Sequence, residues 1–121
     1  MKSYSIVGMN YQKSEQFIEL LPPGTPVTLV REPTNQYDAN AIAVWIDGRK
    51  VGFIPKKQNG VLSQFIDQAG KPLKDIDLQE RSAIIAMDAA DKELPDVMSK
   101  SVSAKFIRSS NSRYPMVEVD G

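Results

Sequence analysis

An Asp47-Gly48 pair between two apolar runs is the feature that most constrains how this chain can fold. Asp-Gly suits the tight turns of β-hairpins, because both central residues of such a turn take positive φ angles. The runs on either side, residues 41–46 and 50–54, therefore predict two antiparallel strands. A polar loop precedes the first of these strands, and a Gly-x-x-Pro sequence, Gly52 to Pro55, ends the second.

The polar loop, residues 32–40, is rich in residues that form turns. Pro33 fixes its own φ angle and disfavours helical geometry at Glu32. Three short polar side chains can bond to nearby backbone and hold the loop compact: Asn35, Asp38 and Asn40. Tyr37 lies among them, so its ring is expected to face solvent more readily than to be buried.

Further strands are expected on both sides of this region. Residues 3–10 predict a first strand with a bulge at Gly8, and residues 25–31 predict a second. An apolar run at 83–87 predicts a buried strand, and residues 91–96 predict an exposed loop. Alternating apolar residues over 102–108 predict a late strand, with 116–119 as its pairing partner.

Residues 58–69 predict the main helix. Apolar side chains recur on one face at helical spacing, namely Val61, Leu62, Phe65, Ile66 and Ala69. Gly70 with Pro72 ends the pattern. Residues 14–21 predict either one short helical turn or an irregular connection, because Pro22-Pro23-Gly24 interrupts their apolar pattern.

These elements predict a mainly β fold of the α+β type. Several short strands, tight turns and one good helix favour a small antiparallel barrel with the helix packed on it. Periodicity by itself does not choose between a barrel and a sandwich. At 121 residues the chain is expected to form a single domain, residues 1–121.

Composition excludes several classes of function. The chain has no cysteine and no histidine, which excludes disulfides and structural zinc and removes the commonest general base. It also lacks a phosphate-binding Gly-x-x-x-x-Gly-Lys-Ser/Thr loop. We therefore expect no enzyme activity, no catalytic residue, no metal site and no cofactor. An oxygen-only magnesium or calcium site stays open, but the acids Asp75, Asp77 and Glu80 are expected to be solvated loop residues.

The chain shows no secretion signal and no apolar run near the roughly 20 residues that span a bilayer, so a cytoplasmic protein without membrane contact is expected. Its formal net charge is zero, which argues against a broad basic face for nucleic acid. The first 66 residues nevertheless carry seven basic and five acidic side chains, so a small local basic site is allowed.

Three ordered motifs resemble the HIRAN domain: Arg31-Glu32-Pro33, Asn35-x-Tyr37-Asp38-x-Asn40-Ala41-Ile42 and Val51-Gly52-Phe53-Ile54-Pro55. This module occurs at the N-terminus of some SNF2-type helicases and as a stand-alone protein in bacteria and phages, the type that this chain resembles. The resemblance implies an OB-like or SH3-like barrel. It also implies recognition of the free 3′-hydroxyl of single-stranded DNA, in DNA repair or replication, with a helicase or nuclease as a partner.

Carried over to this sequence, the resemblance assigns binding roles to aromatic residues and to one acidic residue. Tyr37 would stack on a terminal base, and Asp38 would accept a hydrogen bond from the 3′-hydroxyl. Tyr11 would form the opposite wall of the base pocket, with Tyr4 as a rival for that role. The alternatives are a Tyr37 that packs the loop on the barrel, an Asp38 that only closes a turn, and a half-buried Tyr11.

Basic residues would hold the phosphates. Lys56 and Lys57 follow Pro55 at the start of the main helix, where backbone N–H groups also attract anions. Arg31 is expected to bind a phosphate or to clamp the loop, the alternative being an ion pair with Glu32 or Asp38.

Asn40 is expected to build the loop and, second, to bond a base edge or sugar. Asn10 stands where some family members carry a basic residue. That departure, the zero net charge and the acidic middle of the chain leave a second function open, a protein-interaction module that keeps the fold without binding DNA ends.

Overall fold

The computed structural model describes residues 2–75, 98–108 and 114–119. Its helices are α1 (Met9–Gln12), α2 (Glu15–Glu19) and α3 (Asn59–Ala69), with a 3₁₀ turn at Leu73–Asp75. Its strands are β1 (Lys2–Ser5), β2 (Pro26–Arg31), β3 (Ile42–Ile46), β4 (Arg49–Phe53), β5 (Lys71–Pro72), β6 (Lys100–Ile107) and β7 (Met116–Val119).

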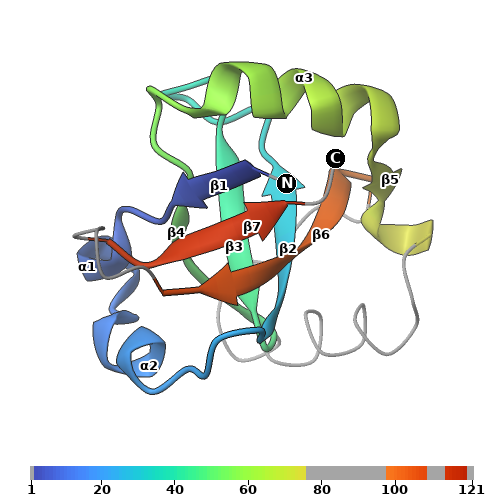
Figure 1. The fold of residues 1–121 in the computed structure, drawn as a ribbon. Coiled ribbons are helices and arrows are strands. Elements are labelled where there is room, and N and C mark those ends of the chain that lie inside the picture. Colours follow the sequence, from blue (N-terminus) through green and yellow to red (C-terminus); the bar gives the residue numbers. More distant parts are fainter. Residues whose placement is uncertain (1, 76–97, 109–113, 120–121) are drawn as a thin grey trace.

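The strands form one curled antiparallel sheet in the order β1-β7-β6-β2-β3-β4, with β5 paired to β6. The two ends of this order meet, because Val7, just after β1, exchanges two backbone hydrogen bonds of 2.8 Å with Phe53 of β4. Figure 1 shows α3 lying across one edge of the curled sheet. The predicted mainly β fold, a small OB-like antiparallel barrel with one main helix, is confirmed.

The hydrophobic core fills the inside of the curl. Large side chains from β2, β3, β4, β6 and β7 are fully buried there, among them Leu29, Ile42, Val51, Phe106 and Val117. From α3, Leu62 and Ile66 complete this core, as the helical spacing predicts. The prediction is wrong at two positions of that face, since Val61 is 68% exposed and Ala69 is exposed as well. Trp45 is buried in a second, smaller cluster with Val30, Ala43 and Leu73.

The hairpin at Asp47-Gly48 is confirmed. Asp47 and Gly48 have φ angles of 53° and 77°, and β3 and β4 pair across them. The predicted pairing of the late strands is also confirmed, since Phe106 of β6 faces Val117 of β7. The predicted strand at 83–87 and loop at 91–96 lie outside the described residues.

The predicted first strand is wrong in its second half. The strand ends at Ser5, and residues 9–12 form the short helix α1. Gly8 is not a bulge, because its left-handed φ of 78° turns the chain from the sheet into α1. The segment 14–21 takes the helical alternative as α2.

Among the described helices, none is both long and apolar enough to cross a membrane.

Closure of the sheet depends on a glycine. A Cβ atom on Gly52 would lie 2.4 Å from the carbonyl oxygen of Val7 and 2.9 Å from the side chain of Ile6. Because the first of these atoms is backbone, no rotamer change can relieve the contact. Gly52 therefore allows β4 to approach the segment that follows β1.

We expect Gly52→Ala to lower the free energy of unfolding by about 1–3 kcal/mol, because β4 must move away from Val7. Gly60→Ala is the matched control, since its Cβ would meet nothing within 4 Å in the first turn of α3. That variant should leave stability unchanged or raise it by up to about 1 kcal/mol. Urea unfolding followed by the fluorescence of Trp45 measures both, and equal effects would contradict the role of Gly52.

Candidate nucleic-acid interface

The loop between β2 and β3 is held together by its own side chains. The side-chain oxygen of Asn35 accepts the backbone N–H groups of Tyr37 at 2.9 Å and Asp38 at 3.1 Å. The amide of Asn35 donates to Glu32 at 3.1 Å. Asn35 is therefore a loop builder, as the sequence predicts.

Tyr37 projects from this loop with 83% of its surface exposed. Its backbone N–H is used to close the loop, while its ring is left in solvent. The alternative in which Tyr37 packs the loop onto the barrel is therefore wrong. An exposed aromatic ring on a fixed backbone is suited to stacking against a flat partner.

Asp38 has a hydrogen bond to each oxygen of its carboxylate. Oδ1 accepts the backbone N–H of Asn40 at 2.9 Å, which closes a turn, and Oδ2 accepts the side-chain amide of Asn59 on α3 at 2.8 Å. These two bonds, Asn59 foremost, lower the pKa of the Asp38 carboxyl, and the charges of Lys56 and Arg31 act in the same direction. Asp38 is thus an anion at neutral pH. Because a carboxylate offers about four acceptor positions, it can accept further hydrogen bonds.

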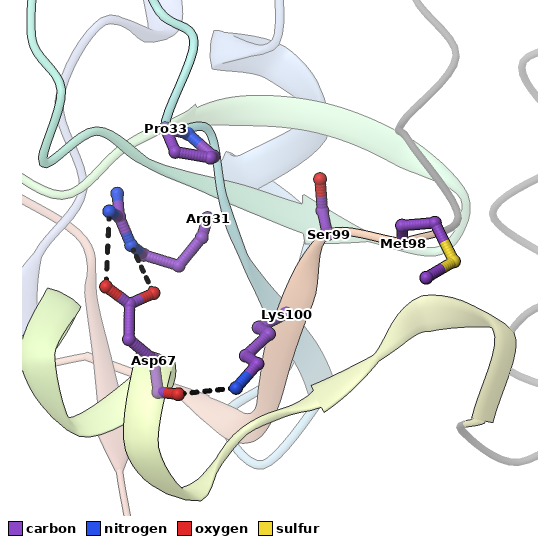
Figure 2. A pocket seen from close by; sticks show the side chains of 6 residues that line it. All are labelled: Arg31, Pro33, Asp67, Met98, Ser99 and Lys100. Atoms are coloured by element: carbon purple, nitrogen blue, oxygen red, sulfur yellow. Dashed lines mark hydrogen bonds and ion pairs between the residues drawn. The ribbon is translucent and has the colours of Figure 1, made fainter.

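Arg31 clamps the loop from beneath. Its side chain comes from β2, is 6% exposed and donates through Nη1 to the carbonyl oxygens of Ala39 at 3.0 Å and Ala41 at 2.9 Å. Its Nε and Nη2 atoms donate to the carboxylate of Asp67 on α3, at 3.0 and 3.4 Å (Figure 2). Of the two predicted roles the structure therefore places Arg31 as the loop clamp, and its ion-pair partner is Asp67 rather than Glu32 or Asp38.

The clamp borders a hollow of about 340 Å³ that is also lined by Pro33, Met98, Ser99 and Lys100 (Figure 2). Lys100 donates to the backbone carbonyl of Asp67 at 2.6 Å. The last turn of α3 is thereby joined to both β2 and β6.

Lys56 and Lys57 lie in an exposed turn between β4 and α3. The backbone of Gln58 closes this turn on Pro55 at 2.9 Å, and the side chain of Gln58 accepts the N–H of Ser5 at 2.9 Å. Lys56 is near enough to Asp38 to lower its pKa. A cation therefore accompanies the carboxylate on this side of the loop. Asn40 is exposed as well, and its backbone is the part that bonds Asp38.

The two candidates for a second aromatic wall differ in position. Tyr11 lies in α1 rather than after a strand, and its side chain is outside the described part of the protein. Tyr4 of β1 is half-buried and packs against the main core. It lines a groove of about 110 Å³ beside α3, together with Lys2, Val61, Leu62, Phe65 and Val119. Tyr4 thus has a packing role that an open stacking ring does not have.

Sequence reasoning missed Asn59 and Asp67. Both lie on α3, and their partners Asp38 and Arg31 are 21 and 36 residues away in the chain. The helical pattern predicts α3 itself, but contacts across such separations carry no local signal. Within the described ranges, no group of three acidic side chains is placed to hold a metal ion.

Removing the clamp should loosen the loop. We expect Arg31→Met to lower the free energy of unfolding by about 2–4 kcal/mol, because two loop carbonyls lose their buried donors. Asp67→Asn should cost about 1 kcal/mol or less, because the Asp67 side chain is 53% exposed. Urea unfolding of the two variants decides the order, and a larger loss for Asp67→Asn would contradict the clamp.

Comparisons with known proteins agree with this architecture. The whole chain superposes on 94% of a protein from Lactobacillus plantarum whose crystal structure is known, with a TM-score of 0.60 and 20% sequence identity. That likeness supports the fold. Among curated proteins none matches. The sequence model of the HIRAN domain matches residues 1–76, which include β1 to β5, α3 and the loop of Tyr37 and Asp38.

The match covers more than half of the chain, and the strands beyond it, β6 and β7, pair within the same sheet. HIRAN domains bind nucleic acid and are binding rather than catalytic modules. Because the model of this domain matches residues 1–76, this chain belongs to the HIRAN domain family.

Proposed function

We propose that this protein binds single-stranded DNA at a free 3′-hydroxyl end and holds the terminal bases with aromatic side chains. The observation that carries the proposal is the adjacency of an exposed ring and a fixed carboxylate, Tyr37 and Asp38, on one clamped loop. The ring supplies a stacking surface, and the carboxylate supplies a hydrogen-bond acceptor.

A carboxylate suits the end of a DNA strand and no other part of its backbone. Inside a strand every sugar is followed by a phosphate, which the Asp38 anion repels. A terminal 3′-hydroxyl is neutral and donates a proton, and a hydrogen bond to an ionised acceptor is stronger than one between neutral groups. Asp38 is ionised at neutral pH, and the lowered pKa of its carboxyl extends the ionised form to more acidic solutions, which supports this role.

Tyr37 would hold a terminal base by stacking, which needs no particular base and is worth about 1–3 kcal/mol. Tyr11 is our candidate for the opposite wall. The Val7–Phe53 bridge sets the chain that enters α1 against the end of β4, three residues before Lys56.

Lys56 and Lys57 would neutralise the last phosphates, and Asn40 would bond the terminal sugar or base edge. Arg31 serves the same site from behind, because its donors hold the loop carbonyls and Asp67. A module of this kind would deliver a DNA end to a helicase or nuclease partner in repair or replication, with the partner supplying catalysis.

The end-reading role predicts a preference among otherwise identical oligonucleotides. A single strand that ends in a 3′-hydroxyl should bind at least about tenfold more tightly than one ending in a 3′-phosphate, because Asp38 attracts the first and repels the second. Fluorescence anisotropy at low salt measures both. Equal affinity would refute the role of Asp38, and no association with either strand would favour the protein-interaction function instead.

The stacking role predicts a difference between two substitutions at Tyr37. Tyr37→Ala should weaken binding about 5- to 100-fold, since it removes a contact worth about 1–3 kcal/mol. Tyr37→Phe keeps the ring and should bind nearly as well as the natural protein. Because the ring is exposed, both variants should unfold at the same urea concentration. A loss of affinity in Tyr37→Phe as large as in Tyr37→Ala would rule out stacking.

A further inference from the structure

We propose that Asn59 is a positioning residue that determines the end specificity of this site, by holding the Asp38 carboxylate in the orientation that meets a terminal hydroxyl. The inference rests on the proposed function and extends it to a residue on α3. Asn59 would touch no nucleotide, and it would act through Asp38.

The geometry gives Asn59 a task that the loop cannot perform by itself. The bond from the Asn40 backbone fixes Oδ1 of Asp38 within the turn. One such bond leaves the carboxylate able to rotate about it. The bond from Asn59 to Oδ2, at 2.8 Å, adds a second fixed point, and the two oxygens together with Cγ define the plane of the carboxylate.

Burial makes Asn59 a rigid anchor. Its side chain is 2% exposed although it begins α3, and the helix backbone holds its Cα atom. An exposed polar side chain would lose rotamer freedom on forming this bond, whereas a buried one has already lost it. The position of Asp38 is therefore fixed relative to the helix, and the helix is fixed to the core through Leu62 and Ile66.

The absence of a charge on the Asn59 side chain also matters for the preference for a hydroxyl over a phosphate. A lysine or arginine at this position would bond the same oxygen but would cancel the charge of Asp38. The loop would then attract a phosphate instead of repelling it. The amide donates its proton and leaves the carboxylate negative, which is the combination that favours a hydroxyl over a phosphate.

The contact is separate from the clamp at the other end of the helix. Arg31, which is paired with Asp67, holds the backbone of the loop at Ala39 and Ala41, while Asn59 holds a side chain. A substitution in the clamp should therefore lower the affinity for every ligand by a similar factor. A change at Asn59 should affect mainly the ligand that uses the carboxylate.

Two oligonucleotides that differ by one oxygen test the proposal, one ending in a 3′-hydroxyl and one in a 2′,3′-dideoxy sugar. In the natural protein the hydroxyl end should bind about tenfold more tightly. Asn59→Ala should reduce this ratio to about twofold, close to that of Asp38→Asn. Asp67→Asn is the matched control on the same helix, and it should keep the tenfold ratio even if both affinities fall.

The nearly isosteric Asn59→Asp adds a readout that a merely structural role would not move. Its new carboxyl faces Asp38, with Lys56 and Arg31 as the neighbouring cations. At pH 8 both carboxyls are charged and repel, so the ratio should be lost. Near pH 5 the pair can share a proton, the donor returns, and the ratio should recover by severalfold. The natural protein should show the same ratio at both pH values.

The outcomes separate the two proposals. If the natural protein prefers the hydroxyl end and folded Asn59→Ala prefers it equally, the role of Asn59 is overturned while the proposed function stands. If the natural protein shows no preference, the proposed function fails and the role of Asn59 fails with it. Should Asn59→Ala not fold, the pH dependence of Asn59→Asp decides, and a ratio that stays at tenfold at pH 8 overturns the inference.

Discussion

The buried guanidinium of Arg31 is the interaction on which the arrangement of this protein depends. A charge that is 6% exposed is tolerated only when its donors are satisfied, and here a carboxylate and two backbone carbonyls satisfy them. The carbonyls belong to the β2–β3 loop and the carboxylate belongs to α3. One side chain thereby joins a strand, a loop and a helix.

The consequence is that the β2–β3 loop is held in a defined position relative to the strands and the helix around it. Polar loops are usually the mobile part of a small domain, because few apolar contacts hold them. This loop is attached to α3 at two places, through Asp67 beneath it and through Asn59 at Asp38, while Asn35 closes its interior. An exposed ring such as Tyr37 can then be held out in solvent at a defined position, as an adaptable binding surface on a fixed base requires.

Local patterns predict most of the helices and strands, because the spacing of apolar residues and the turn residues within each segment depend on that segment's own backbone geometry. Asp47-Gly48 specified the hairpin through its positive φ angles, and the spacing of Leu62 and Ile66 specified the helix. The pattern failed after Ser5, where the left-handed φ of Gly8 leads into α1 in place of the expected bulge, next to the pairing of Val7 with Phe53. It also overstated the buried face of α3 at Val61, since the width of that face is set by what packs against it.

By itself, the sequence determined the fold class, the absence of cysteine and histidine chemistry, and the loop that carries Tyr37 and Asp38. These features depend on residue type and short-range spacing. The tertiary structure decided which charge meets which. It paired Arg31 with Asp67 and Asp38 with Asn59, across 36 and 21 residues, and it packed a half-buried Tyr4 against the core while leaving Tyr37 in solvent. Such contacts depend on how α3 lies against the curled sheet, and no stretch of neighbouring residues encodes that placement.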